Sequence, residues 1–500
     1  MLSGVINTNV NALYALNSLS NTTNTASTLE QELSTGLSIN SPADNPAGYI
    51  AAQGFTAQLG GIAQATSNAN QAISLVQTAD GAITQQVNIL QNILSIASQA
   101  ANGGATSQQL AALQQVVSQL ETQVSTISQQ TTFNGVNLLD GTFQGVNFQV
   151  GAGAGQTIGL SLGSTAANQI GAYQSSGAAA GLYHTDGKST GGVADNTGSS
   201  YAITSGGAGA FTTAAAIGVS GSSGNANFAV SAGNESALGV SQAINAITSS
   251  TNVSAAADTS VAFTVTAGSF SFTLGNGTGA AQTNPSQITA TVTSVSQSGL
   301  AGLVNAINEN TGTTGVTATV NAANKLILTQ SQGDNISIAG FSGTGTLAAG
   351  GTATTTLAQA GTTTATVQGL VTLQSNQSFA LAAAASDIGL NTSSALSAIS
   401  SVNVSTVAGA TAALNVVNFA LQQLEGVGGQ LGATQQRLQA TVSNLQATDT
   451  NLTAAQGVVQ DANIPEVTSK LTQQEILQQA GVSALAQSNT LQQSFLKLLQ

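Results

Sequence analysis

Apolar residues recur at helical spacing near both ends of this 500-residue chain. Toward the C-terminus one row falls every seventh position without a miss: Val417, Leu424, Leu431, Leu438, Leu445, Leu452 and Val459. Toward the N-terminus, one run from Phe55 to Ala97 and a second from Leu110 to Ile127 alternate spacings of three and four. These periods predict three long amphipathic helices, and the C-terminal row is long enough for a coiled coil.

We expect these stripes to pack together as the core of a helical bundle, because leucines at this spacing are most often core residues. The residues assigned to the bundle core are Leu90, Leu94, Leu113, Leu120, Leu424, Leu431, Leu438, Leu445 and Leu452. In the segment INSPADNPAG, Ser41 is the expected N-cap and Pro42 the expected first helical residue. Pro465 is expected to break or kink the C-terminal helix.

Further apolar stripes lie outside the predicted bundle, at the two ends of the chain. Their residues are Ile6, Val10, Leu13, Leu16, Leu477, Ala484, Leu491, Phe495 and Leu498. An amphipathic helix at a free end frays in water unless its apolar face is covered. We therefore expect these residues to pack against a partner.

The centre of the chain has a different pattern. Residues 176–395 are rich in Gly, Ala, Ser and Thr, and alternating runs such as VAFTVTAGSFSFTL (261–274) and KLILTQ (325–330) predict strands. Residues 237–265 and 299–329 form an internal repeat in which Ala243-Ile244-Asn245 aligns with Ala306-Ile307-Asn308. Each copy is predicted to be a short helix followed by two strands.

The expected fold class is therefore mainly α at the two paired chain ends, with long antiparallel coiled-coil-like helices, a β-hairpin and an inserted α+β or β-rich central region. The hairpin is predicted around GAGAG (151–155), which follows the strand-like FQGVNFQV. The predicted domains are terminal helices (1–43 plus 462–500), a helical bundle with the hairpin (44–175 plus 396–461), and the central region (176–395).

Charge and reactive side chains are scarce. Charged residues make up 5% of the chain, with 5 Lys or Arg against 18 Asp or Glu, and no basic residue precedes Lys188. Nucleic-acid binding needs clustered cations, so it is excluded. Cysteine is absent and His184 is the single histidine, which excludes thiol chemistry and histidine zinc motifs. No enzymatic activity, cofactor or metal is expected, and neither a secretory signal peptide nor a membrane-spanning segment is predicted.

Several motifs near both ends resemble bacterial flagellin. The N-terminal ones are VINTN at 5, LSTGLSINSPADNPAG at 33, QATSNANQAISLVQTADGA at 64, TTFNGVNLLDG at 131 and FQVGAGAGQTI at 148. The C-terminal ones are LGATQQRLQATVSNL at 431, NLTAAQGVVQDANIPE at 451 and ILQQAGVSALAQSN at 476. The motifs occur in the family's order over about 175 residues at one end and 100 at the other. Several motifs in the same order make the resemblance specific.

The resemblance implies a structural subunit that polymerises into the flagellar filament for swimming motility. The terminal helices would line the inner filament core, the bundle would form the outer core, and the central region would project outward. The implied partners are further copies of the chain, the export apparatus and an export chaperone, and the cap and hook-junction proteins. The implied location is extracellular, after export without a cleaved signal peptide.

Departures from the family are expected to matter for host detection and for pH. The family's innate-receptor surface includes an Arg-rich stretch on the first long helix, where this chain has Asn92, Leu94 and Ser95. The low charge also suggests a filament suited to an acidic medium.

Two alternatives remain: a hook–filament junction protein, which shares the helical ends, and a non-flagellar surface adhesin, which would explain the Ser/Thr-rich centre alone.

Overall fold

The computed structural model describes residues 9–102, 104–176, 192–194, 200–204, 216–229, 236–278, 281–321, 323–349, 355–357, 365–367, 369–382 and 391–498. Ile6 and His184 lie outside these ranges. The chain forms two compact units: Met1–Gln77 with Gln144–Ser161 and Leu431–Gln500, and Thr78–Phe143 with Leu162–Gln430. The long helices are α1 (Val10–Thr35), α2 (Pro46–Ala101), α3 (Ser107–Gln130), α8 (Val407–Gln460) and α9 (Ile464–Leu498).

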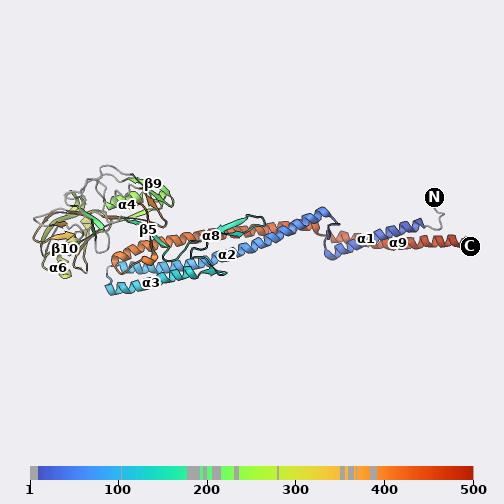
Figure 1. The fold of residues 1–500 in the computed structure, drawn as a ribbon, viewed down its shortest axis with the longest axis horizontal. Helices are drawn as coiled ribbons and strands as arrows, with labels where there is room; N and C mark the ends of the chain where they lie inside the picture. The colour runs from blue at the N-terminus through green and yellow to red at the C-terminus, as the bar shows by residue number, and fades with distance from the viewer. Residues whose placement is uncertain are drawn as a thin grey trace. The chain divides into compact units, whose positions relative to one another are not determined.

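In the first unit, α1 and α9 lie side by side as an antiparallel pair (Figure 1). Asn9 at the start of α1 bonds to Ser488, and Thr23 further along α1 accepts a 3.3 Å hydrogen bond from Gln478. At the other end of the pair, the amide of Ser38 donates to the carbonyl of Gln460 at 2.7 Å. The two helical ends of the chain are therefore paired, as the predicted fold class states.

The start of α2 differs in detail from the sequence prediction. Pro46 is the first helical residue, and the Asn45 side chain accepts from the amide of Gly48 at 3.0 Å, so Asn45 rather than Ser41 caps the helix. Ser41 instead lies in a turn that Asp44 holds by accepting from the amides of Ser41 and Asn40. These backbone donors lower the pKa of Asp44. Pro465 lies at the second position of α9, just after α8 has ended.

The predicted hairpin is present in the first unit. Strands β3 (Val146–Gln149) and β4 (Thr157–Leu160) pair antiparallel around the GAGAG turn. The hairpin contacts α2, because Asn68 donates to the carbonyl of Gln149 at 3.0 Å. A Cβ added to Gly61 would lie 2.9 Å from that of Ala152, so the glycine permits this close approach.

The second unit contains a helical bundle built from α3, the C-terminal part of α2 and the N-terminal part of α8. A capping box between Thr106 and Gln109 starts α3. The α3 residues buried in the bundle are Leu110, Val117, Glu121, Val124 and Ser128. The Gln86 side chain on α2 donates to the carbonyls of Val124 and Thr165 at 3.0 and 3.3 Å, which joins α2 to α3 and to the segment after the hairpin.

The second unit also contains the β-rich region, drawn around the labels β5, β9 and β10 in Figure 1. Its strands are β1 (Thr132–Phe133), β2 (Val136–Asn137), β5 (Gly171–Ser176), β6 (Gly192–Ala194), β7 (Ser200–Thr204), β8 (Ala216–Gly221), β9 (Gly224–Ala229), β10 (Ser254–Val265), β11 (Gly268–Thr278), β12 (Ala281–Val292), β13 (Thr317–Val320), β14 (Leu326–Gln330), β15 (Ile336–Ser342), β16 (Leu347–Ala349), β17 (Thr355–Leu357), β18 (Ala365–Val367), β19 (Leu370–Ser375), β20 (Ala380–Leu381) and β21 (Ala395–Ala398).

The main sheet follows the order β13-β14-β10-β19-β5-β21, and a second follows β12-β11-β15-β18-β7-β6. One apolar core fills the space around β10–β15 and helix α6 (Gln297–Asn308), with Phe263, Phe272 and Phe341 among its largest buried side chains. A smaller core lies between α4 (Ala237–Asn245), β8, β9 and β19. The fold class predicted from the sequence, helical ends with a β-rich centre, is thus confirmed.

The two aligned central segments use the same hydrogen bonds. Asn245, the last residue of α4, exchanges two hydrogen bonds with the backbone of Ala255, and Asn308, the last residue of α6, does the same with Ala318. A single-turn helix follows each, α5 (Thr248–Thr251) and α7 (Thr311–Thr314). The strands then differ: β13 pairs with β14, whereas β10 and β11 lie in different sheets.

The residues assigned to the bundle core differ in burial. Leu90, Leu424, Leu431 and Leu438 are fully buried. The half-buried ones are Leu94, Leu113, Leu120, Leu445 and Leu452. Beside Leu94 and Leu120 on their helices, Ile93 and Glu121 are the buried residues.

Candidate functional site

The terminal helices leave much of their apolar surface uncovered. Of the 26 residues of α1, only Ala26 and Leu29 are buried. On α1, Leu13 is 56% and Leu16 53% exposed, and on α9 Ile476 is 61% exposed. Two helices bury only the seam between them, so a large fraction of each apolar stripe still faces outward. Leu33 on α1 and Ile464 on α9 are exposed as well. We call seven of the exposed residues of this pair the terminal patch: Val10, Leu13, Tyr14, Leu16, Ile476, Leu477 and Val482.

The predicted packing residues fall on this helix pair as far as the structure describes them. Val10, Leu13, Leu16 and Leu477 belong to the terminal patch, and Ala484 is exposed on α9. Ile6 lies outside the described residues, as do the side chains of Leu491, Phe495 and Leu498, whose backbone is helical. The seven-residue row that includes Leu477 and Ala484 falls on the exposed side of α9, whereas the less exposed positions of α9 include Gly481, Leu485 and Ser488. Tyr14, Ile476 and Val482 lie outside the rows chosen from the sequence, so the sequence pattern did not identify them.

Charge contributes little to this surface. The ion pair that the described residues show on α9 joins Lys470 and Glu466 at 2.8 Å, four residues apart and both well exposed. The pair lowers the pKa of Glu466 and raises that of Lys470. An exposed i,i+4 pair of this kind adds little to helix stability, because water and salt screen it. The residues of the terminal patch are themselves uncharged.

A second uncovered surface lies on the first unit, where the hairpin turn meets α2 and α8. It is a hollow of about 710 Å³ whose apolar walls include Ile62, Val150, Leu445 and Leu452. This explains why two of the assigned core leucines are only half-buried. Nothing in the seven-residue pattern could indicate it, because the hairpin that forms one wall lies about 300 residues away from α8 in the sequence.

Asn92, Leu94 and Ser95, the three positions that the resemblance relates to a receptor surface, lie on α2 in the second unit. Asn92 and Ser95 are exposed, and Leu94 is half-buried. Two neutral side chains therefore face solvent where the resemblance implies arginines.

Comparison with known proteins relates the chain to flagellar proteins. A profile of the bacterial flagellin N-terminal helical region matches residues 6–144, one of the C-terminal helical region matches 414–499, and a flagellin hook IN motif matches 269–332. The chain is similar to B-type flagellin of Pseudomonas aeruginosa, at 34% identity over 99% of both chains. It is also similar to a flagellin of Xenorhabdus nematophila, at 40% identity over 32% of this chain and 52% of that one.

Among solved structures, it matches FliC from Burkholderia pseudomallei at 23% identity, covering 73% of this chain and 99% of that one, with a TM-score of 0.28. It matches FlgL of Xanthomonas campestris at 10% identity, covering 79% and 97%, with a TM-score of 0.33.

The paired helical ends, the β-rich insertion and the profile matches define a filament subunit of the bacterial flagellum. The chain belongs to the bacterial flagellin family. The full-length relative is a flagellin, which favours a filament subunit over a hook–filament junction protein. No helix within the described ranges is both long and apolar enough to cross a membrane.

Proposed function

We propose that the terminal patch of α1 and α9 is the surface through which copies of this chain polymerise. The supporting observation is the exposure of apolar side chains along both helices, including Leu16 and Leu477. Burial of apolar surface between copies stabilises an assembly by about 25 cal/mol for each Å² removed from water. The proposed partners are the α1–α9 helix pairs of neighbouring copies of the chain.

Repeated head-to-tail contacts that do not close generate a filament. In this proposal residues 1–43 and 462–500 form the inner core, and residues 44–175 with 396–461 form the outer core around it. Residues 176–395 project outward. The hollow walled by Leu445 and Leu452 receives a neighbouring copy in the same assembly.

The proposed role is mechanical and includes no catalysis, cofactor or metal. It is supported by the family and by a composition with no cysteine and one histidine. The filament functions outside the cell, so the chain must pass through the flagellar export apparatus with an export chaperone. The cap and hook-junction proteins are its further partners at the two ends of the filament.

The test replaces Leu16 or Leu477 by Asp in the full chain. An unpaired carboxylate in an apolar interface is strongly unfavourable, so filaments should fail to form while the monomer keeps its helical content. Sedimentation and electron microscopy measure assembly, and circular dichroism measures folding.

Gln115→Asp is the matched control, because Gln115 is exposed on α3 in the second unit and the substitution adds the same charge. It should assemble normally. Normal filaments from both leucine variants would contradict the proposal, as would equal loss of assembly in the control.

A further inference from the structure

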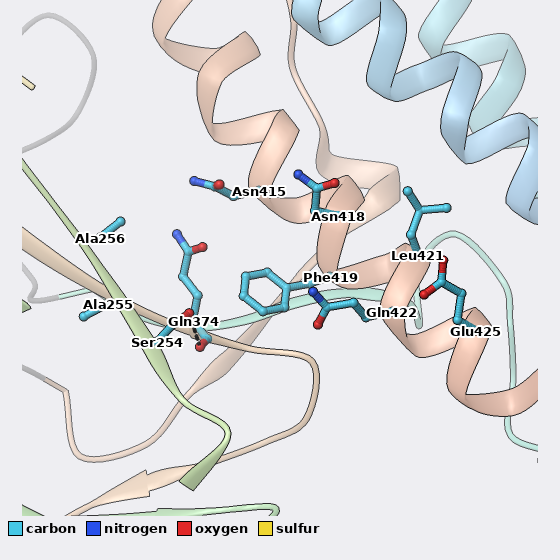
Figure 2. Close-up of a pocket in the computed structure, with 10 residues that line it drawn as sticks. All are labelled: Ser254, Ala255, Ala256, Gln374, Asn415, Asn418, Phe419, Leu421, Gln422 and Glu425. Carbon is cyan, nitrogen blue, oxygen red and sulfur yellow. Dashed lines mark hydrogen bonds between the residues drawn. The ribbon is translucent and has the colours of Figure 1, made fainter. Parts of the chain in front are cut away.

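A separate hollow in the second unit is lined by carboxamides. It has a volume of about 450 Å³ and lies between α8 and the strands β10 and β19. Its walls include Gln374 on β19 and Asn415, Asn418 and Gln422 on α8 (Figure 2). The volume is within the range of about 300–1,000 Å³ that is usual for small-ligand sites.

The side chain of Gln374 is the most telling feature of this hollow. Gln374 is 7% exposed, yet its side-chain amide has no hydrogen-bond partner within the described residues, and only its backbone carbonyl accepts from Ser254. Figure 2 shows the side chain extending from β19 toward the face of α8 that carries Asn415 and Phe419. The amide of this largely buried side chain opens into the hollow, so an occupant of the hollow can supply its hydrogen bonds.

The other walls define the chemistry of that occupant. On the α8 wall, Asn418 and Gln422 are exposed and Asn415 is half-buried, so their side chains are accessible, and each carboxamide offers both donors and an acceptor. Phe419 presents a half-buried ring beside them. Glu425 is the sole charged lining residue, so no cation is available to hold a phosphate or a carboxylate.

We propose that this hollow binds a neutral saccharide. A sugar hydroxyl donates and accepts at once, so adjacent hydroxyls match the two ends of a carboxamide. The C–H face of a pyranose carries a slight positive potential that suits the face of the Phe419 ring. Glu425 can accept from two hydroxyls but repels anions. A peptide fits less well, because the opposite wall, Ser254–Ala256, has only small side chains and no pocket for a larger one.

Two experiments test sugar binding by the full-length monomer. Saturation-transfer NMR measures binding of D-glucose, D-galactose, D-mannose and N-acetyl-D-glucosamine, and co-sedimentation measures binding to dextran. We expect at least one neutral sugar to bind with a Kd on the order of 1 mM. Saturation transfer from the protein to a free sugar supports a soluble ligand, and binding to dextran alone supports a surface polysaccharide. Inorganic phosphate and a neutral Gly-Ser peptide serve as competitors and should not displace the sugar.

Three variants locate the site. Gln374→Leu and Gln422→Leu should each weaken binding about tenfold, because hydroxyl partners are lost. Phe419→Tyr should retain it. Gln446→Leu is the matched control for Gln422→Leu, since Gln446 is exposed on α8 outside the hollow, and it should leave binding unchanged.

Gln422 is exposed, so its variant tests the proposal even if Gln374→Leu impairs folding. The proposal is overturned if no probe binds, if the wall variants bind as tightly as the native chain, or if phosphate or the peptide displaces the sugar.

Discussion

The side-chain nitrogen of Gln86 donates to the carbonyl oxygen of Thr165 at 3.3 Å, inside the helical bundle of the second unit. The same nitrogen donates to Val124 on α3, but the Gln86 oxygen has no partner among the described residues. The hydroxyl of Thr165 and one carboxyl oxygen of Glu121 are likewise buried without a partner. The bundle thus buries a small polar layer, and Glu121 is its ionisable member.

Glu121 should make the bundle more stable in mild acid. Burial raises its pKa from 4.5 to about 7. Below pH 4.5 both the folded and the unfolded states hold the proton, so Glu121 carries no ionisation penalty there. As pH rises toward 7 the unfolded state releases the proton first, and the free energy of unfolding falls by an amount on the order of 2–3 kcal/mol.

Glu121→Gln should remove most of this pH dependence and raise stability at pH 8. The measurement is urea unfolding of the monomer from pH 4.5 to 8.5, followed by circular dichroism. Asp80→Asn, on the exposed surface of α2, is the matched control and should preserve the slope. An unchanged slope in Glu121→Gln would show that Glu121 is not its source.

Two adjacent glycines on α2 should respond in opposite directions to alanine. A Cβ at Gly60 meets nothing within 4 Å, so Gly60→Ala should raise the free energy of unfolding by about 0.5–1 kcal/mol through helix propensity. At Gly61 the added Cβ lies 2.9 Å from the Ala152 Cβ, so Gly61→Ala should destabilise the hairpin contact instead. Thermal unfolding of the two variants checks the contrast, and equal shifts would refute it.

Removing the central region should leave the helical bundle intact. Strands β5 and β21 pair antiparallel, with Gln174 opposite Ala395. A chain in which Asn-Gly joins these two residues should therefore close as a hairpin. We expect it to fold and to polymerise, as seen by circular dichroism and electron microscopy. A folded but non-polymerising product would place the central region in the filament core.

The monomer should activate the vertebrate innate flagellin receptor weakly. Asn92 and Ser95 are exposed on α2 but carry no charge. Loss of arginine anchors at an interface costs about 2–5 kcal/mol. A reporter-cell assay compares the native chain with the Asn92→Arg, Ser95→Arg double variant, which should signal more strongly. Potent signalling by the native monomer at low concentration would disprove the prediction.

The filament should tolerate acid better than a conventionally charged flagellin. The chain carries a formal charge of −13 at pH 7, and its five basic residues with His184 limit it to +6 once the carboxylates are protonated. Self-repulsion therefore stays small in acid. Filament length measured from pH 7 to about pH 2.5 should change little, whereas dissociation at the same pH as a charged flagellin would exclude an adaptation to acid.

Periodicity predicted the helices well because each long helix has an apolar face, and the strands of 261–274 because their side chains alternate. The position of a helix cap, in contrast, cannot be read from periodicity when two nearby residues both fit. Ser41-Pro42 and Asn45-Pro46 both match a cap followed by proline, and the turn held by Asp44 selects the second.

Tertiary packing determines the burial of Glu121 and the position of the carboxamide hollow, and the sequence pattern predicted neither. Glu121 occupies a core position although a carboxylate there contradicts the apolar pattern, so sequence reasoning passed over it. The carboxamide hollow brings Gln374 near Asn415 from a strand and a helix 41 residues apart. No spacing rule connects two such residues, and only the folded chain places them together.

The pairing of α1 with α9 also sets an order of events during synthesis. Asn9 and Ser488 are bonded across a separation of 479 residues, so α1 is synthesised long before its partner α9. A chain truncated before residue 464 would present α1 without that partner helix. The seam between the two helices therefore forms only after α9 has been made.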